Sequence, residues 1–217
     1  MTRTELRNSR AQRTRRKRAR RIRRMRGIMI VILVISAVLC GTRLAKNMRY
    51  SGINAEDGVP LLLQTDERWK DTPYGNSTIE ISGCGPTCLS MVLVALTGNQ
   101  DMTPASVAEF SQTNGYYVDG IGTSWSLMSD GAKKLGLKVK ELPLDEKTIA
   151  DRLNNGYPVI CSVTRGDFTD EGHFIVLTSY ENGSFRVNDP NSSVNSARAW
   201  SYDRLKGQIS AMWTYRG

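Results

Sequence analysis

Cysteine and histidine, which can do nucleophilic chemistry together, are both scarce in this chain. Cys84 stands in the sequence Gly83-Cys84-Gly85-Pro86, directly before a run of apolar residues. Proline favours the first turn of a helix, so this spacing predicts that Cys84 begins one. A thiol at a helix start faces unpaired backbone N–H groups and the positive end of the dipole, which stabilise the thiolate and an oxyanion beside it. Cys84 is therefore a candidate nucleophile.

His173 is the single histidine of the 217 residues. It opens a run, 173–180, whose β-branched and aromatic residues predict a strand. A lone histidine is more often structural, but a cysteine hydrolase needs an imidazole that removes the thiol proton and later protonates the leaving group. The pair of Cys84 and His173 therefore favours catalysis. One histidine also argues against a zinc site of the usual Cys/His kind, and we expect no metal and no other cofactor.

An acidic residue after the next predicted strand, 184–188, is placed to orient the imidazole. If 181–183 forms a three-residue hairpin loop, Asp189 lies opposite Ile175 and diagonally from His173, at roughly 7 to 8 Å between backbone positions. A two-residue Asn182-Gly183 loop would put the two residues on opposite faces. The sequence leaves Asn188 and Asp167 as alternative orienting residues.

The elements that must position these residues follow from capping and periodicity. Predicted helices cover 84–96 with Gly98 beyond, 104–113 after Thr103, 124–135 closing at Gly136, and 146–154 capped by Asp145. Predicted strands cover 157–164, 173–180, 184–188 and 209–215. The predicted helices come first in the chain and the predicted strands follow them, which predicts an α+β fold. Its antiparallel sheet should pack on the first helix, which is apolar nearly all round.

The positive charge of the chain is concentrated at its N-terminus. Residues 1–26 hold twelve arginines and one lysine against one acid, a charge of +12, so the +9 of the whole chain leaves −3 for the rest. An apolar run follows from Gly27 to Thr42. We interpret 27–45 as a transmembrane signal anchor, although a cleaved signal peptide is an alternative. The positive-inside rule then leaves the arm in the cytoplasm and the remainder outside.

This topology predicts four parts: a cytoplasmic arm at 1–26, the anchor at 27–45, a linker at 46–58 and one folded domain at 59–217. An arm inside the cell and a domain outside it exclude a nucleic-acid-binding function for the whole protein, so we expect contact with anionic lipid instead.

Three of the four cysteines, Cys84, Cys88 and Cys161, lie in the exported part. An odd count leaves at least one thiol free or paired with another molecule. Cys88 and Cys161 could form a disulfide or remain two buried thiols, and the sequence does not decide between these states.

The cysteine motif, together with Gly172-His173-Phe174 and Asn188-Asp189-Pro190, resembles the double-glycine-leader peptidase-like group of papain-like cysteine peptidases. The segment from Val59-Pro60 through Gln64 and Trp69 is similar to the start of its exported, stand-alone branch. The resemblance covers most of 59–215 and implies a papain-like fold.

The resemblance also implies roles for four residues. Cys84 would be the nucleophile, His173 the general base, Asp189 the orienting acid and Gln64 the oxyanion-hole donor. On local sequence alone, Gln64 looks like an exposed residue at the end of a strand. In transporter-linked members the glutamine lies close before the cysteine, whereas twenty positions separate the two here.

These observations predict a membrane-anchored cysteine peptidase that acts on a peptide or protein outside the cell. Two alternatives remain. The first is an amidase or acyltransferase that acts on cell-wall peptides with the same cysteine and histidine. The second is a non-catalytic surface module that binds peptides in a degenerate cleft.

Overall fold

The computed structural model describes residues 58–217, together with Met25 and Met29. The predicted arm, anchor and linker therefore lie outside the described residues, apart from these two methionines and Gly58. Among the helices that are described, none has the length and apolar character needed to cross a membrane. All elements discussed below belong to one of the two compact units of the chain, Tyr50–Gly217.

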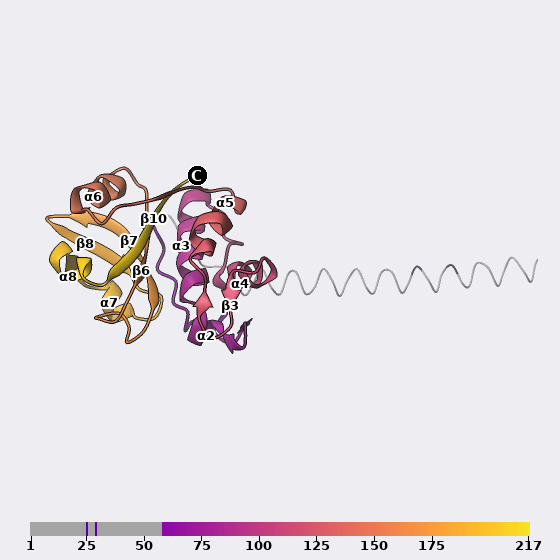
Figure 1. Cartoon of the computed structure of the whole chain (residues 1–217). Helices are drawn as coiled ribbons and strands as arrows, with labels where there is room; N and C mark the ends of the chain where they lie inside the picture. Colours follow the sequence, from indigo (N-terminus) through magenta and orange to yellow (C-terminus); the bar gives the residue numbers. More distant parts are fainter. Residues whose placement is uncertain (1–24, 26–28, 30–57) are drawn as a thin grey trace, which may run out of the picture. The chain divides into compact units, whose positions relative to one another are not determined.

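A six-stranded antiparallel sheet forms the centre of this unit, in the order β5-β10-β6-β7-β8-β9 (Figure 1). Its strands are β5 Lys138–Glu141, β6 Val159–Val163, β7 His173–Glu181, β8 Ser184–Asn188, β9 Ala199–Ser201 and β10 Ile209–Arg216. The four predicted strands are present, and the short edge strands β5 and β9 were not predicted. Two small hairpins lie outside the sheet, β1 Pro73–Tyr74 with β2 Ser77–Thr78, and β3 Tyr117–Val118 with β4 Gly122–Thr123.

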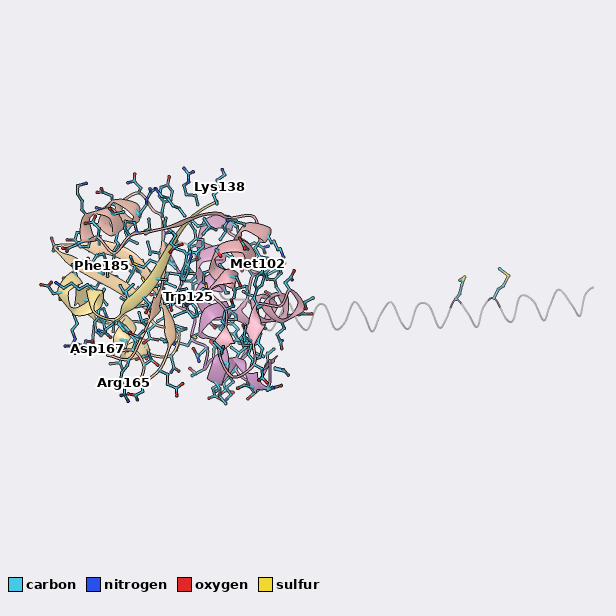
Figure 2. All side chains as sticks on the ribbon, viewed as in Figure 1. Met102, Trp125, Lys138, Arg165, Asp167 and Phe185 are labelled. Atoms are coloured by element: carbon cyan, nitrogen blue, oxygen red, sulfur yellow. The ribbon has the colours of Figure 1, made fainter. Side chains whose placement is uncertain are left out.

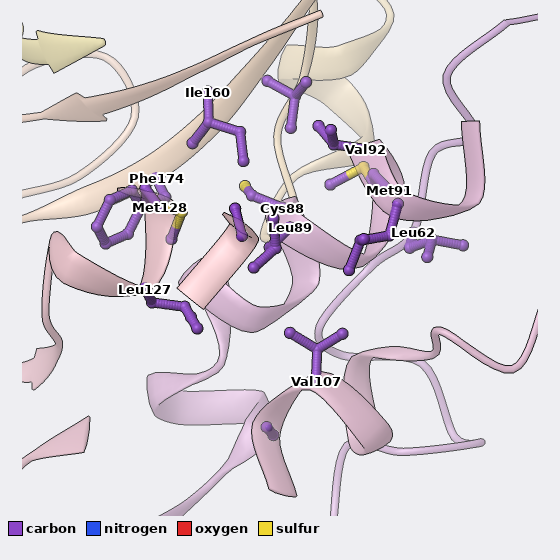
Figure 3. Packing of buried hydrophobic residues seen from close by; sticks show 14 of the residues in the cluster. Leu62, Cys88, Leu89, Met91, Val92, Val107, Leu127, Met128, Ile160 and Phe174 are labelled. Carbon is purple, nitrogen blue, oxygen red and sulfur yellow. The ribbon is translucent and has the colours of Figure 1, made fainter. Parts of the chain in front are cut away.

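Helices cover both faces of the sheet (Figure 1). They are α2 Ile79–Ser82, α3 Cys84–Thr97, α4 Pro104–Thr113, a π-helical turn at Leu127–Gly131, α5 Ala132–Lys134, α6 Glu146–Asn154, α7 Ser193–Ser196 and α8 Tyr202–Lys206. On one face, the buried side chains of α3 belong to one cluster with Ile160, Phe174 and Val176 of the sheet, and α4 packs on α3 (Figure 3). On the other face, residues of α6 and α8 pack against alternate positions of the same strands, such as Cys161 and Ile175.

This two-sided burial explains why α3 is apolar nearly all round. Ten of its fourteen residues are buried, because the sheet covers one side of the helix and α4 with its neighbours covers the other. The predicted α+β architecture, with an antiparallel sheet on a central helix, is confirmed.

Three of the four predicted helices are confirmed, because local chemistry sets their ends. Gly98 ends α3 in the left-handed conformation, with φ of 67°. Thr103 caps α4 by accepting a hydrogen bond from the Ser106 N–H, and Asp145 caps α6 in the same way. Such caps satisfy backbone donors that the helix itself leaves unpaired.

The predicted helix at 124–135 is wrong at its start and in its form. Ser124 belongs to the closure of the β3–β4 hairpin, where its N–H donates to the Tyr116 carbonyl. The chain then forms the π-helical turn from Leu127 and only afterwards the short α5. A tertiary contact of this kind has no local signal in the sequence.

Candidate active site

Cys84 is the first residue of α3, as its sequence context predicts. The first hydrogen bond of the helix runs from the Thr87 N–H to the Gly83 carbonyl. The N–H groups of Cys84 and Gly85 therefore have no partner within the helix, and Pro86 has no N–H to offer. Cys84 is partly exposed, whereas the residues that follow it in α3 are buried. The thiol thus lies beside two backbone donors at the end of a rigid, buried element.

His173 opens β7 and is 7% exposed. Its Nε2 lies 2.8 Å from Oδ1 of Asp189, which is 1% exposed. Because Nε2 is engaged by the carboxylate, Nδ1 is the ring nitrogen that remains for the direct interaction with the Cys84 thiol. The structure thus brings Cys84, His173 and Asp189 into one chain of contacts.

The β7–β8 hairpin reaches this arrangement by a route that differs from the one expected. Glu181 pairs with Ser184, so the loop has two residues, Asn182 and Gly183, both with positive φ. By itself this loop would place Asp189 on the wrong face. A register shift between Leu177 and Ser179 compensates for it by adding one residue to β7.

Toward the start of β7, beyond this one-residue bulge, the register places Asp189 and His173 on the same face of the sheet. Val176 pairs with Asn188, so Asp189 follows at the position opposite Ile175 and on the same side as His173. Asp189 thus lies opposite Ile175, as expected for a three-residue loop, although the loop is the two-residue alternative.

Two residues that hold Asp189 were not found by sequence reasoning. The Asn195 side-chain amide donates to Asp189 Oδ2 over 2.9 Å, and the Asp189 N–H donates to Ser196 Oγ over the same distance. The Asn191 N–H donates to Oδ1, the atom that also contacts His173. A polar turn after Asp189-Pro190, followed by the Ser192 cap of α7, is the signal that could have indicated these contacts.

The surroundings of Cys84 and His173 favour their charged forms. Burial raises the pKa of Cys84, but the hydrogen bond and charge of His173, with the N–H groups of Phe174 and Gly85, bring it below its ordinary value. Burial lowers the pKa of His173, and the contacts with Asp189 and Cys84 more than compensate, raising it to about 10. Between the two pKa values the pair exists as thiolate and imidazolium.

The other two cysteines of the described part are free thiols with a different environment. Cys88 and Cys161 are both fully buried. Burial raises the pKa of each thiol well above its ordinary value, and no cation offsets the burial. They are therefore inert apolar groups of the core rather than nucleophiles.

Gln64 is buried rather than exposed, at 3%. Its N–H donates to the Pro190 carbonyl, and its side-chain Nε2 donates to the Glu80 carbonyl over 2.6 Å. Gln64 thus joins the segment before Cys84 to the segment after Asp189. An amide nitrogen carries two hydrogens, so one remains for another acceptor. Gln64 is not among the residues that line the cavity at Cys84.

The two alternative orienting residues make other contacts. The Asn188 amide donates to the carbonyls of Val59 and Pro60, which fixes the start of the domain. Asp167 forms an ion pair with Arg204 and accepts a hydrogen bond from Gln208. The structure therefore places neither of them on the His173 ring.

A cavity of about 470 Å³ opens above Cys84 and His173. Its walls come from the α2–α3 junction at 81–84, the β3–β4 hairpin and its exit at 117–125, and 171–174 at the start of β7. Trp125, labelled in Figure 2, is one of the lining residues, and its Nε1 donates over 3.0 Å to Oγ of Ser162, another lining residue. Among residues 58–217, no group of three His, Cys, Asp or Glu side chains is placed to hold a metal ion.

The hairpin wall packs directly on the glycine next to Cys84. A Cβ at Gly85 would lie 2.6 Å from Thr123 Cγ2, and the Thr123 hydroxyl is held by Tyr74. We expect Gly85→Ala to lower the free energy of unfolding by about 1 to 3 kcal/mol, because the overpacked wall must shift. Gly172→Ala, beside His173, is the matched control, since a Cβ there meets nothing within 4 Å. Urea unfolding of both variants measures the difference, and equal stabilities would contradict the predicted clash.

The chain is similar to known proteins in sequence and in structure. A family model described as the Peptidase_C39 like family matches residues 56–217. The peptidase domain of Streptococcus ComA, a bi-functional ABC transporter involved in quorum sensing, is 23% identical with a TM-score of 0.49, over 63% of this chain and 93% of that one. The corresponding domain of Streptococcus mutans ComA is 22% identical with a TM-score of 0.46, over 72% and 98%.

A Bacillus anthracis protein described as a C39-like peptidase is 17% identical with a TM-score of 0.41, over 76% of this chain and 96% of that one. No curated protein matches the chain at a significant level. The family assignment depends on the sequence match, which spans 162 of the 217 residues. The chain therefore belongs to the C39-peptidase-like family of papain-like cysteine peptidases.

Proposed function

We propose that this protein is a membrane-anchored cysteine peptidase that hydrolyses peptide bonds outside the cell through Cys84, His173 and Asp189. The observation that carries the proposal is the chain of contacts from the helix-terminal thiol through the imidazole to a carboxylate that is 1% exposed. This arrangement supplies a nucleophile, a base and an orienting group in the order that thiol hydrolysis requires.

In the proposed reaction, the Cys84 thiolate attacks the carbonyl carbon of the substrate, and the oxyanion that forms faces the N–H groups at the start of α3. The His173 imidazolium then gives its proton to the leaving amine, and a thioester remains on Cys84. Water, deprotonated by the neutral imidazole, hydrolyses this thioester and restores the thiol. Gln64 is a further proposed oxyanion donor, through the amide hydrogen that Glu80 does not bind.

The cavity supports a preference within peptide substrates. Three large apolar side chains of its lining are exposed, Ile81 at 73%, Ile121 at 79% and Trp125 at 50%. Glu171 is the one carboxylate in the described lining. Apolar side chains would bury this surface, and a basic residue would pair with Glu171. The proposed substrate is thus a peptide that carries apolar and basic residues near the cleaved bond.

The location of the domain outside the cytoplasm is also part of the proposal. The +12 arm and the apolar segment at 27–45 support an anchor that leaves the domain outside the cytoplasm. A protease added to intact cells should then digest the domain, and a cytoplasmic control protein should survive. Protection of the domain until the cells are lysed would contradict this topology.

A peptide mixture tests the activity and its alternatives. The full chain in non-ionic detergent is incubated with a proteome-derived peptide mixture, and new termini are identified by mass spectrometry. We expect cleavage after a covalent acyl adduct forms on Cys84, and Glu171→Gln should reduce cleavage beside basic residues. New N-termini without the matching new C-terminal carboxylates, with the acyl group found on another amine, would favour an acyltransferase. The absence of any adduct would favour a binding module.

A further inference from the structure

A pocket rich in positive charge lies at one edge of the sheet, and the proposed peptidase chemistry does not use it. It has a volume of about 200 Å³. Its polar lining consists of Lys138, Lys140, Arg152, Tyr157, Thr214 and Arg216, which come from β5, β10, α6 and the segment after α6. None of these residues lines the cavity at Cys84. Figure 2 shows Lys138 at the margin of the fold, away from Trp125 of that cavity.

The pairing of β5 with β10 places like charges against each other. Arg216 pairs directly with Lys138, and Thr214 pairs with Lys140. Paired residues and residues two positions apart project from the same face of a sheet, so these four side chains form one patch. Like charges directly opposite each other on neighbouring strands destabilise the pairing. An anion between them would remove this cost.

Within the described part of the chain, none of the four cations of the pocket forms an ion pair. Two carboxylates close to them in the sequence are placed elsewhere. Asp151 is bound by Lys147 over 2.7 Å. Glu141 pairs with Trp213 and, as the neighbour of Lys140 along the strand, projects from the opposite face. Among the described residues, no carboxylate therefore lies within 4 Å of the charged nitrogens of the pocket.

Thr214 gives an independent indication of a ligand. The residue is 4% exposed, and its Oγ1 is buried without a hydrogen-bond partner. A buried hydroxyl in this state costs stability, which a bound acceptor would restore. On the other side of the pocket, the Arg216 guanidinium lies over the Tyr157 ring, 5.8 Å from its centroid, and this contact restricts the orientation of its donors.

We propose that this pocket binds a phosphate group. Two lysines, two arginines and a hydroxyl present donors from three elements, an arrangement that suits a tetrahedral dianion with acceptors in several directions. The volume admits free phosphate or the terminal phosphate of a larger molecule. Inorganic phosphate in solution and the headgroup of an anionic lipid are the two sources of this chemistry, and the experiment distinguishes them.

Thermal unfolding of the full chain in non-ionic detergent tests the proposal. A ligand that binds only the folded state raises Tm, so about 20 mM potassium phosphate should raise it by roughly 4 °C over potassium chloride of equal ionic strength. Arg216→Gln and Thr214→Val should lose most of this rise, whereas Lys206→Gln, which removes one charge outside the pocket, should keep it. The arginine-rich arm is present in every variant, so its contacts with phosphate cancel.

Two further readouts separate a ligand site from a structural role. Without phosphate, Lys138→Gln and Thr214→Val should have the same Tm as the parent or a higher one, because each removes an unfavourable feature. Co-sedimentation with vesicles of phosphatidic acid, whose headgroup is a terminal phosphate, compared with phosphatidylcholine, tests the lipid source. If Arg216→Gln loses the rise in Tm with phosphate but still binds vesicles, the site binds a free anion. If it loses vesicle binding but keeps the rise in Tm, the site binds a lipid headgroup. If Arg216→Gln changes neither, the proposal is overturned.

Discussion

Replacement of Cys84 by alanine is expected to lower the rate of peptide hydrolysis by about 10⁴-fold or more, because the proposed thioester cannot form without the sulfur. The fold should tolerate the change, since Cys84 is partly exposed at the start of α3. The rate is measured on a peptide identified from the mixture experiment, with unfolding in urea as the test of stability. Full activity in Cys84→Ala would exclude the proposed mechanism.

Cys88→Ala is the matched control for this prediction. Cys88 lies one helical turn further along α3 but is fully buried, and burial keeps its pKa well above the ordinary value. Its removal should cost about 1 kcal/mol of stability through a small cavity and leave the rate of hydrolysis within about twofold of the parent, as core changes distant from the reacting atoms usually do. Equal losses in the two variants would mean that damage to the core, and not chemistry, explains the effect.

The parts of the fold that could be predicted are those set by neighbours in sequence. The glycine after α3, the Thr103 cap and the Asp145 cap each satisfy backbone groups within a few residues, so their positions are visible in the chain itself. The edge strand β5 was missed for the opposite reason. Its sequence, Lys-Val-Lys-Glu, carries little apolar mass, and only the pairing with β10 makes it a strand.

The candidate site was predictable in its residue types and only partly in its geometry. A scarce histidine and a cysteine at a helix start indicated a pair that the topology of the sheet then brings together. The register of Asp189 depends on two features that offset each other, a two-residue turn at Asn182-Gly183 and the bulge between Leu177 and Ser179. A bulge follows from packing on both faces of the sheet, so local sequence does not reveal it.

The walls of the cavity were beyond sequence reasoning. The hairpin around 117–125 contributes more of the lining than any other segment, yet its strands have two residues each. Its position depends on buried hydroxyl contacts of Tyr74 with Ser111 and Thr123, residues 37 and 49 positions away. Contacts over such separations leave no periodic pattern in the sequence, so the hairpin was not predicted.

The pH dependence of Cys84 alkylation should distinguish a thiolate–imidazolium pair from an ordinary thiol. The lowered pKa of Cys84 keeps more of the sulfur ionised near neutral pH than in an ordinary thiol, and the pKa of His173, raised to about 10, keeps the imidazole protonated through neutral pH. Iodoacetamide should therefore react with Cys84 faster at pH 6 than with an ordinary thiol, and the rate should fall as the pH drops through the lowered pKa of Cys84.

In His173→Ala the imidazolium that stabilises the thiolate is absent. Burial then raises the pKa of Cys84 to the ordinary value or above. A thiol with a pKa of about 8.5 is less than one per cent ionised at pH 6, so the rate of alkylation there should fall by about 100-fold and recover as the pH rises. Asp189→Asn should give an intermediate shift, because the imidazolium loses its buried carboxylate while the ring remains. Asp167→Asn, which removes a carboxylate bound to Arg204, should leave the profile unchanged. If all three variants keep the profile of the parent, the reactivity of Cys84 comes from the start of α3 alone, and His173 does not act as its base.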